Sequence, residues 1–388
     1  MKFVPPSLIA AWLIAATAFL SPAAAQEAPS SEALEQAEEK RTEVYADQLE
    51  TYLQDWLVNK YADRADKAWN RDYSSLEAYA KSVAPNRERW REVVVRPLPL
   101  EKSGELERKP YAPLAKYNAQ WLTLPLGGLD AEAILVIPEG ATADNPAPLV
   151  IAQHGIGSYP EKNFGLLDPR DAYQNVAGQL IDAGFAILAP MNLKGVERRN
   201  RIERLCRLAD TSLPGIEFTR VQKLLDEVLQ DPRVDEDRVG MWGLSLGGLA
   251  TMFWMPMEPR IKAGVVSGWY NHRRNKMAIP DPRYSCFLDT REEHAFFQGW
   301  LTEFTDSDVV SLICPRPIFI QHGKQDRIAH WPQVEEEFNV ATTHYEKLGL
   351  RDRIELDMHE GGHINNVKPG LAFLKKWLME RPGELPGN

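Results

Sequence analysis

A serine between two glycines lies where a predicted strand gives way to a predicted helix. The apolar, β-branched run at residues 238–242 favours a short buried strand, and the small apolar residues at 248–254 favour a helix. Between them stands Gly243-Leu-Ser-Leu-Gly247. Strand, sharp turn and helix form the context in which a G-x-S-x-G motif presents a nucleophile. We therefore predict that Ser245 is a catalytic nucleophile.

A serine hydroxyl needs a general base, and that base needs an acidic group to hold it in the right tautomer. Two later predicted strands each end in a glycine turn that is followed by a suitable residue. Residues 318–321 lead to Asp326, and residues 353–358 lead to His363. The carboxyl ends of parallel strands meet at one edge of a sheet. We predict His363 as the general base and Asp326 as the group that orients it.

Other residues compete for these two roles. Asp357 and Glu360 are alternative acids if Asp326 only caps its loop, and His359 is an alternative base. His359-Glu-Gly-Gly-His363 also satisfies the H-E-x-x-H pattern of zinc proteases, which requires a helix. Two adjacent glycines cost roughly 2 kcal/mol of helix propensity, and a strand is predicted just before them. We predict no metal and no cofactor.

Two backbone N–H groups are expected to stabilise the oxyanion that forms during acyl transfer. One is the N–H of Leu246, at the start of the predicted helix. The other is expected from the loop Gln153-His-Gly-Ile-Gly157, where the glycines let the backbone approach a substrate, and we nominate Ile156. His154 is expected to be a structural or pocket-wall hydrogen-bonding residue rather than a second base.

Substrate-binding candidates follow two other strands. Trp269 and Tyr270 come just after residues 262–267, and they could stack on a sugar or aryl group or pack at the strand end. Residues 194–207 hold six basic residues, among them Arg199. This stretch is a candidate to seat an anionic group such as a uronate carboxylate. The alternative is a loop that is tied by ion pairs with nearby acidic side chains.

The first residues have the pattern of a secretory signal peptide. One cation precedes an uncharged apolar run of 14 residues, 7–20, and Ala23-Ala-Ala25 supplies a cleavage site. We predict export, with cleavage after Ala25, to the periplasm or the medium. The apolar run is too short for a stable membrane span. Residues 26–90 are predicted as a helical appendage whose Tyr, Trp and Leu residues recur at helical spacing, and residues 91–388 as the catalytic domain.

Composition limits the classes of partner and the redox chemistry. The 388 residues carry a net charge of −10, which argues against a nucleic-acid partner. Three cysteines are present. Cys314 is expected to be an inert core thiol, and Cys206 with Cys286 is the one pair that could form a disulfide after export. The oligomeric state does not follow from the sequence.

Short apolar strands and amphipathic helices alternate along the rest of the chain. This pattern predicts a mostly parallel sheet with helices on both faces. Strands are expected at residues 93–95, 119–124, 131–137, 149–152, 185–190, 238–242, 262–267, 318–321 and 353–358, and helices at 172–183, 218–229 and 371–379.

Four segments together resemble the α/β-hydrolase superfamily, and are closest to its dienelactone hydrolase, acetyl xylan esterase and prolyl-oligopeptidase-like branch. They are His154-Gly-Ile-Gly, Gly243-Leu-Ser-Leu-Gly-Gly, His-Gly-Lys-Gln-Asp326 and Gly-Gly-His363. Asp231-Pro-Arg-Val-Asp-Glu-Asp-Arg-Val-Gly240 is also typical of that branch. The resemblance implies an α/β-hydrolase fold with an eight-stranded sheet, ester hydrolysis through an acyl-enzyme, and no cofactor. Residues 290–305 have no clear counterpart in the branch.

The sequence therefore predicts an exported serine hydrolase that acts on carboxylic esters, with an acylated carbohydrate or another small-molecule ester as substrate. A peptidase of the same fold is the nearest alternative, although no β-propeller pattern precedes the domain in this sequence. A catalytically silent binding scaffold is the alternative from a different class.

Overall fold

A computed structural model describes residues 30–168 and 170–381 of the chain. The predicted signal peptide, residues 1–25, lies outside the described residues. The chain divides into two compact units, with the boundary between Tyr52 and Leu53. This boundary falls within helix α1 (Ser31–Val58). The second unit contains the sheet and all the residues that the sequence nominates for chemistry.

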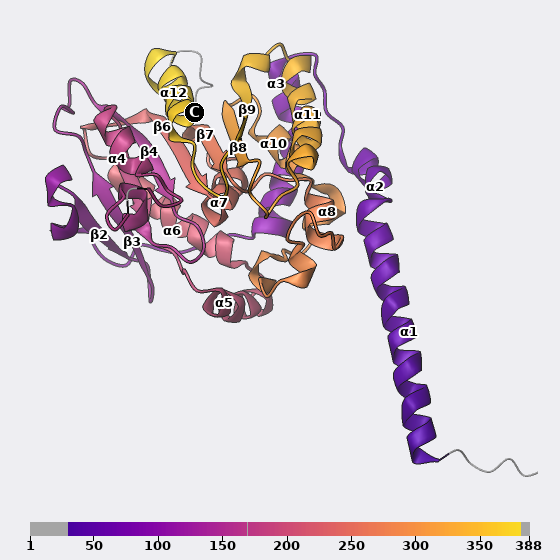
Figure 1. Ribbon diagram of the computed structural model, residues 1–388. Coiled ribbons are helices and arrows are strands. Elements are labelled where there is room, and N and C mark those ends of the chain that lie inside the picture. The colour runs from indigo at the N-terminus through magenta and orange to yellow at the C-terminus, as the bar shows by residue number, and fades with distance from the viewer. Residues whose placement is uncertain (1–29, 169, 382–388) are drawn as a thin grey trace, which may run out of the picture. The chain divides into compact units, whose positions relative to one another are not determined.

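The second unit is built on one nine-stranded sheet (Figure 1), in the order β1-β2-β3-β5-β4-β6-β7-β8-β9. The first three strands are antiparallel to their neighbours, and β5, β4, β6, β7, β8 and β9 run parallel. The strands are β1 (Glu107–Pro110), β2 (Gln120–Pro125), β3 (Asp130–Val136), β4 (Ala147–Gln153), β5 (Ala186–Pro190), β6 (Val234–Leu244), β7 (Ile261–Ser267), β8 (Ile318–Gly323) and β9 (Ile354–His359). The predicted mostly parallel sheet with flanking helices is confirmed.

The expectation of eight strands is wrong by one. The additional strand, β1, is the short edge strand Glu107–Pro110, which is mostly exposed. Its sequence Glu-Arg-Lys-Pro is charged and ends in proline, so it lacks the alternation of apolar and polar residues that would have identified it.

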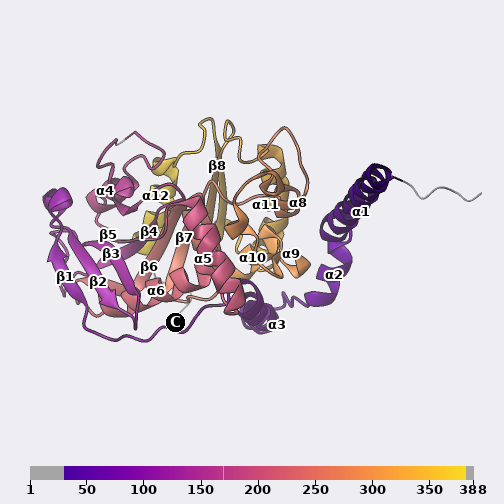
Figure 2. The same ribbon diagram turned by 90° about the horizontal axis from the view of Figure 1, so that it is seen from below.

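Helices cover both faces of the sheet (Figure 2). One apolar core includes side chains of α3, α6, α7, α10 and α11, and the other includes side chains of α4 and α12. The helices of the second unit are α2 (Tyr61–Ala68), α3 (Leu76–Arg89), α4 (Val176–Asp182), α5 (Val196–Leu208), α6 (Leu213–Val228), α7 (Leu246–Trp254), α8 (Arg273–Ala278), α9 (Trp300–Glu303), α10 (Asp306–Ile313), α11 (Trp331–Lys347) and α12 (Val367–Lys375).

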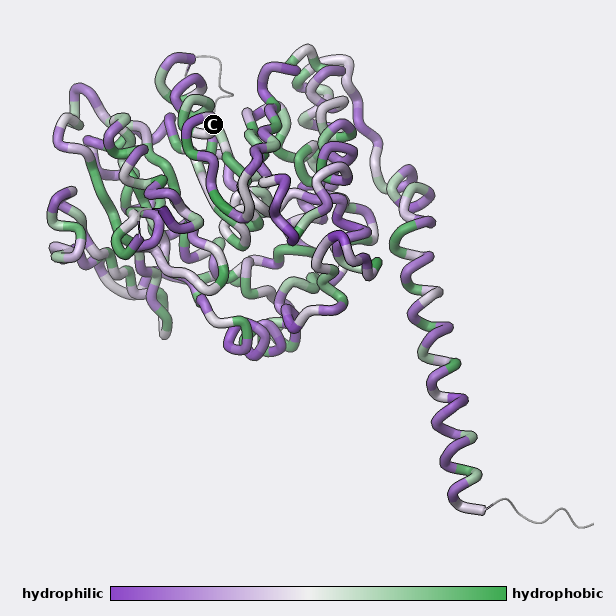
Figure 3. Tube along the Cα trace, in the orientation of Figure 1, coloured by the Kyte–Doolittle hydropathy of each residue, from purple (hydrophilic) through white to green (hydrophobic). Residues whose placement is uncertain are grey.

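The central strands are apolar on both faces because both faces are covered. Every residue of β4, β5, β7 and β8 is buried, and the green segments in the middle of Figure 3 mark this layer. The elbow strand β6 pairs with β4 on one side and β7 on the other. Ser245 is therefore held at the carboxyl edge of the sheet by paired neighbours on both sides.

Two expectations about local structure are wrong. Residues 93–95 were expected as a strand, but they end a π-helical segment, η1 (Trp90–Val95), that continues α3. Its buried residues, Trp90, Val94 and Val95, lie on one helical face, so tertiary packing overrides the strand preference of the three valines. The basic stretch 194–207 is not a loop, because most of it forms helix α5.

The cysteines form no disulfide. Cys206, Cys286 and Cys314 all lie in the described part of the chain, and each is a buried free thiol. The disulfide between Cys206 and Cys286, which the sequence left open, is therefore not formed, whereas the buried core thiol expected at Cys314 is confirmed. Burial raises the pKa of the Cys314 thiol to about 12. Within the described ranges, none of the helices has the length and apolar character that a membrane crossing requires.

Candidate active site

The turn between β6 and α7 places Ser245 in a backbone conformation that few residues adopt. Its φ is 60° and its ψ is −119°. Such a conformation is strained for a residue with a side chain and persists only where the surroundings enforce it. The Ser245 N–H donates to Ser267 O at 2.8 Å, which anchors the turn to β7. The serine is half-buried and opens into a pocket.

Three glycines make this turn possible because there is no room for a Cβ atom. A Cβ on Gly243 would lie 1.9 Å from Gly247 O, and one on Gly247 would lie 2.1 Å from Gln153 O. A Cβ on Gly155 would lie 2.8 Å from Leu244 O. Any residue larger than glycine at these positions would therefore collide with the adjoining backbone.

Asp326 and His363 come together at the ends of β8 and β9. His363 Nδ1 lies 2.7 Å from Asp326 Oδ2, and Ile328 N–H donates to Asp326 Oδ1 at 3.0 Å. Burial acts to raise the pKa of Asp326, but the hydrogen bond from His363 and the nearby His363 and His322 rings outweigh it and lower the pKa. The Asp326 carboxylate is therefore charged at neutral pH.

The loop that carries His363 is fixed on both sides. Gly268, at the end of β7, has a φ of +60°, and a Cβ there would lie 2.8 Å from His363 Cε1. Two residues beyond the histidine, Asn365 Oδ1 accepts a hydrogen bond from Trp242 Nε1 of β6 at 3.2 Å. The Asn365 amide also donates to Tyr173 O at 3.1 Å. The ends of β6, β7, β8 and β9 thus determine together where the imidazole lies.

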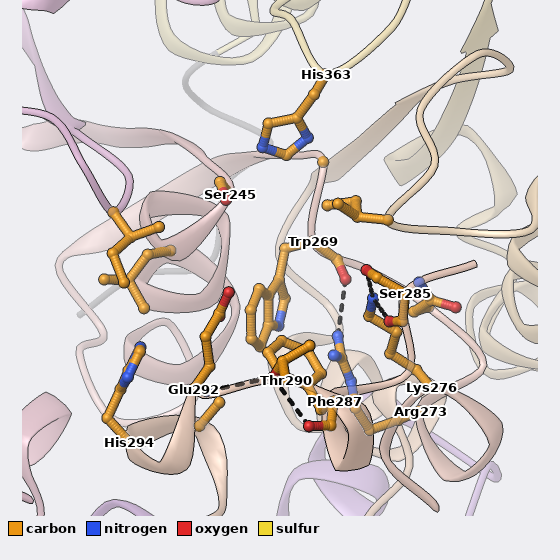
Figure 4. A pocket seen from close by; sticks show the side chains of 16 residues that line it. Ser245, Trp269, Arg273, Lys276, Ser285, Phe287, Thr290, Glu292, His294 and His363 are labelled. Carbon is orange, nitrogen blue, oxygen red and sulfur yellow. Dashed lines mark hydrogen bonds between the residues drawn. The ribbon is translucent and has the colours of Figure 1, made fainter. Parts of the chain in front are cut away.

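Ser245 and His363 line the same pocket, with the imidazole at its mouth (Figure 4). The structure therefore brings all three nominated residues to one edge of the sheet. Asp326 and His363 are hydrogen-bonded to each other, while no hydrogen bond joins the described side chains of His363 and Ser245.

The competing assignments differ in position. His359 ends β9, and its Nδ1 accepts a hydrogen bond from Gly361 N–H at 3.1 Å. Glu360 pairs with Lys324, and Asp357 accepts from Asn366 Nδ2 at 2.8 Å. The H-E-x-x-H segment is the end of a strand followed by a bend, so its histidines do not share a helix face. Among the described residues no group of three or more His, Cys, Asp or Glu has the spacing of a metal site.

Two backbone N–H groups near Ser245 are available to an oxyanion. Leu246 is the first residue of α7, so its N–H has no acceptor within the helix. In the loop after β4, Gly155 N–H donates to Tyr173 Oη at 2.8 Å and Gly157 N–H donates to Lys194 O at 2.8 Å. Ile156 lies between them and lines the pocket. Its N–H makes no hydrogen bond to any described residue.

His154, for which the sequence left open a structural role or a substrate-binding place in the pocket wall, does not line the pocket. It is buried, its Nδ1 lies 2.9 Å from Gly155 O, and its Nε2 accepts from Asn192 N–H at 3.1 Å. Burial lowers its pKa, so the ring is neutral. His154 therefore holds the loop that carries Ile156 and has no free nitrogen for a ligand, which corrects the substrate-binding assignment.

The pocket has a volume of about 210 Å³, and its wall combines charged and hydroxyl-bearing side chains with apolar ones. Six of its lining residues come from the segment after α8, which includes residues that have no clear counterpart in the related branch. The lining residues are Ile156, Ser245, Leu246, Gly268, Trp269, Asn271, Arg273, Lys276, Ser285, Phe287, Thr290, Glu292, His294, Ala295, Ile328 and His363.

Of the other predicted substrate-binding residues, only Trp269 lines the pocket. Tyr270 is fully buried, and its hydroxyl donates to Glu337 O at 2.7 Å. Arg199 is fully buried and forms two hydrogen bonds to Glu217, at 2.6 and 3.1 Å. Both residues were nominated because they follow strand ends, but both point into the protein. Their assignment as substrate-binding residues is corrected.

Four charged or ionisable side chains of the pocket were missed from the sequence. Arg273 and Lys276 lie on α8, and Glu292 and His294 lie on the segment that follows. Arg273 forms a buried ion pair with Asp306 at 2.7 Å. Their sequence signal is weak, because nothing in the charge pattern of either segment separates a pocket wall from an ordinary surface.

Burial shifts the pKa of three of these groups. It lowers the pKa of Lys276 to about 8 and that of His294 to about 3, and it raises the pKa of Glu292. Lys276 Nζ donates to Ser285 Oγ at 2.9 Å, and His294 Nδ1 lies 2.9 Å from Asn200 Oδ1. An amide oxygen only accepts, so the proton of His294 is on Nδ1 and its Nε2 is an acceptor.

The basic helix α5 holds this wall of the pocket. Arg207 Nη2 donates to Glu293 O at 2.8 Å and to Phe296 O at 2.9 Å. Asn200 Nδ2 donates to Arg291 O at 2.7 Å, and Arg204 Nε donates to Glu293 at 2.9 Å. Two of the six basic residues of the 194–207 stretch, Arg204 and Arg207, therefore help to fix the segment that carries Glu292 and His294.

Known proteins similar to this chain share its fold. YtaP of Bacillus subtilis (strain 168), described as a hydrolase, is 25% identical over 271 residues, which cover 66% of this chain and 87% of the relative. A Bacteroides fragilis crystal structure described as an acetyl xylan esterase has a TM-score of 0.58 at 16% identity, covering 80% of this chain and 82% of that one. A glucuronoyl esterase from Caldicellulosiruptor kristjansonii has a TM-score of 0.56 at 17% identity, covering 80% and 88%.

A family model also matches this chain. The model of the prolyl oligopeptidase family matches residues 180–378, just over half of the sequence. The match includes the elbow serine and both residues of the Asp326–His363 hydrogen bond. The chain belongs to the prolyl oligopeptidase family and has the α/β-hydrolase fold.

Proposed function

We propose that this protein is an exported serine hydrolase that cleaves carboxylic esters through an acyl-enzyme. Ser245 is the nucleophile, His363 is the general base and then the general acid, and Asp326 orients the imidazole. The observation that carries the proposal is the 2.7 Å hydrogen bond between His363 Nδ1 and Asp326 Oδ2, at the mouth of the pocket that Ser245 lines.

The hydrogen bond to Asp326 fixes which nitrogen of His363 is basic. A carboxylate only accepts hydrogen bonds, so the His363 proton lies on Nδ1 and the lone pair on Nε2. As Ser245 Oγ attacks the ester carbonyl carbon, Nε2 takes the hydroxyl proton. The same proton then passes to the alcohol oxygen as the C–O bond breaks. Water repeats the sequence with Ser245 as the leaving group and releases the acid.

The carbonyl oxygen becomes negative in each tetrahedral intermediate. Leu246 N–H and Ile156 N–H are the groups we assign to it, because neither has an acceptor among the described residues and both residues line the pocket beside Ser245. Donors that are fixed before the reaction stabilise the charge without reorganising. The strained turn at Ser245 contributes by holding the Leu246 N–H at the start of α7.

The charges on the pocket wall favour a polar substrate, and we propose an acylated carbohydrate. Lys276 and Glu292 bring an amine and a carboxyl group to the pocket, and neither forms an ion pair with another described residue. A sugar hydroxyl can accept from Lys276 and donate to Glu292, and Trp269 offers an apolar face beside them. Carbohydrate esterases among the solved structures of this fold support this choice.

Peptide hydrolysis is the second candidate, because the matched family is named for an oligopeptidase. The same three residues would attack an amide, with His363 protonating the leaving amine. Relative rates on esters and peptides separate the two candidates.

Labelling with a fluorophosphonate probe tests the nucleophile. We expect wild type to be labelled stoichiometrically, and both Ser245→Ala and His363→Ala to lose labelling. His359→Ala tests the competing base and is expected to keep it. If folded wild type is not labelled, the triad is wrong and the binding-scaffold interpretation takes its place.

A substrate panel tests the proposed class. Acetylated xylo-oligosaccharides, an aryl acetate and a peptide anilide would be compared by kcat/KM. We expect Lys276→Met and Glu292→Gln to raise KM for the sugar ester while leaving the aryl acetate within about twofold, because only the sugar uses those groups. A higher kcat/KM on the peptide would favour the peptidase.

Export is tested by the N-terminus of the mature protein. Cleavage after Ala25 gives a chain that starts at Gln26 in the periplasm or the medium. A full-length chain retained inside the cell would contradict it. The division predicted at residue 90 falls inside the second compact unit, because side chains of α3 and η1 pack in the same core as the sheet.

A further inference from the structure

A second histidine lies directly behind the acid of the proposed triad. His322 is the fifth residue of β8, and its side chain is 1% exposed. Its Nδ1 lies 3.7 Å from Asp326 Oδ2. That oxygen is also the one that meets His363 Nδ1. His322 takes no part in the mechanism given above.

The ring of His322 is buried without satisfying its polar atoms. Neither Nδ1 nor Nε2 has a hydrogen-bond partner among the described residues. A neutral imidazole carries one N–H donor and one acceptor, and burying both unpaired costs free energy. Buried polar groups of folded proteins are almost always paired, so an unpaired one calls for an explanation.

The ring is neutral, and its surroundings keep it so. Burial lowers the pKa of His322 to about 4, and the nearby His363, Arg273 and His359 also act to lower it. Asp326 is the one charged neighbour that acts to raise it. His322 therefore offers Asp326 a neutral N–H group and not a cation.

We propose that His322 is a positioning residue for Asp326, with its Nδ1–H directed at Oδ2. This inference rests on the function proposed above. A typical N–H···O hydrogen bond spans about 2.9 Å, so a shift of less than about 1 Å closes the contact. Hydrogen bonds in an active site are often long before substrate binds and tighten in the reacting complex. No proton is transferred to or from His322 during the reaction.

The contact would complete the hydrogen bonds to the carboxylate. Oδ1 accepts a hydrogen bond from Ile328 N–H, and Oδ2 accepts one from His363. Once the shift has brought His322 within hydrogen-bonding distance, Oδ2 also accepts from His322. Donors on both oxygens hold the plane of the carboxylate, and therefore the plane of the His363 ring. Without His322, the Asp326 carboxylate would have one donor fewer and would bind the protonated His363 ring more strongly.

Two substitutions of His322 test this role. His322→Leu removes the donor, and His322→Asn keeps an N–H near the position of Nδ1. We expect His322→Leu to lower kcat about tenfold with KM within about twofold, and to move the acidic limb of the kcat/KM pH profile to higher pH. His322→Asn should recover most of kcat and return the limb toward its wild-type position.

A buried histidine outside the site provides the matched control. His344 is 6% exposed, lies on α11, and its Nδ1 is 2.7 Å from Tyr73 Oη. We expect His344→Leu to lower Tm without changing the acidic limb. Wild-type kcat in both His322 variants, or equal losses in both with an unchanged limb, would overturn the positioning role.

A measurement on wild type does not depend on the variants folding. In ¹⁵N-histidine NMR spectra, we expect His322 to stay neutral from pH 5 to 9 with its proton on Nδ1. A proton on Nε2, or titration near pH 6.5, would overturn the proposal. Fluorophosphonate labelling of wild type in the same samples shows whether the triad itself holds, so the two proposals fail separately.

Discussion

At the scale of single residues, the site requires glycines at positions where a Cβ atom would not fit, as well as the residues proposed to react. Ser245 adopts a φ of 60°, a conformation that costs of order 1–3 kcal/mol and is enforced by its neighbours. Glycines at 243 and 247 leave the space that the turn occupies. Gly268 does the same for His363, because the imidazole lies where a Cβ would otherwise stand.

A methyl group at residue 268 should therefore displace His363, the proposed general base. We expect Gly268→Ala to lower kcat at least tenfold, since the new Cβ would lie 2.8 Å from His363 Cε1. The positive φ adds a stability loss of about 1–2 kcal/mol. Gly349→Ala is the matched control, because Gly349 has a φ of +71° and a Cβ there meets no atom within 4 Å outside its chain neighbours. Esterase rates measured beside urea unfolding separate the two effects, and an unchanged kcat in Gly268→Ala would contradict this view of the site.

At the scale of elements, strand ends hold the proposed reacting groups, and a separate segment forms part of the pocket wall. Ser245, Asp326 and His363 follow β6, β8 and β9, whereas Glu292 and His294 lie on the segment that α5 fixes. Arg207 supports that segment through two backbone carbonyl groups. Substrate affinity and bond cleavage should therefore respond to different substitutions.

Removing the contacts that hold the pocket wall should weaken substrate binding more than it slows bond cleavage. Arg207→Ala removes the two hydrogen bonds to Glu293 O and Phe296 O, and we expect KM for a polar ester to rise threefold or more. The kcat on a small aryl acetate should stay within about twofold. Arg201→Ala, an exposed position on the same helix, is the control and should change neither value. A fall in kcat with constant KM would show that α5 supports the reacting groups instead.

The sequence predicted the parts of the structure that have a regular pattern of apolar residues and turn residues. The strands next to the elbow are continuous apolar runs, and the turns after β8 and β9 have glycines, so the positions of Asp326 and His363 followed from topology. Side-chain direction did not follow. Tyr270 and Arg199 come after strand ends as Trp269 does, but they turn into the protein to meet Glu337 and Glu217.

The residues of the pocket wall could not be predicted from the sequence, for a related reason. Lys276 and Glu292 lie on a short helix and a segment of 3₁₀ turns, which have no apolar period to mark an inner face. The edge strand β1 and the π-helical η1 were missed because packing, and not local pattern, decides them. Long-range contacts fix these parts, and a single sequence does not display such contacts.

At the scale of the whole molecule, a sheet covered on both faces buries several histidines. Burial lowers the pKa of His322 to about 4 and those of His294 and His344 to about 3. An unfolded histidine has a pKa near 6.5, so below that pH the unfolded chain binds protons that the folded chain does not. These residues therefore leave the free energy of unfolding unchanged above pH 6.5, and they lower it progressively as the pH falls from 6.5 toward about 4.

Acid should destabilise this protein before its surface carboxylates titrate. Each buried histidine can lower the free energy of unfolding by up to about 1.4 kcal/mol per pH unit below pH 6.5. We expect urea unfolding to show a loss of several kcal/mol between pH 7 and 5. His344→Gln isolates one contribution from those of the buried carboxyl groups, and its slope against pH should be shallower than that of wild type. Parallel slopes would contradict the assignment.

The hold of α5 on the pocket wall has a consequence for how such an enzyme could diverge. Helix α5 and the segment it supports lie outside the strands that carry Ser245, Asp326 and His363. A gene could therefore exchange the helix and its segment together, as a matched pair, and acquire a new preference while its reaction stayed the same. Exchanging either one alone would break the contacts between them. Among related proteins, changes in substrate preference should therefore involve changes in the helix and in the segment together.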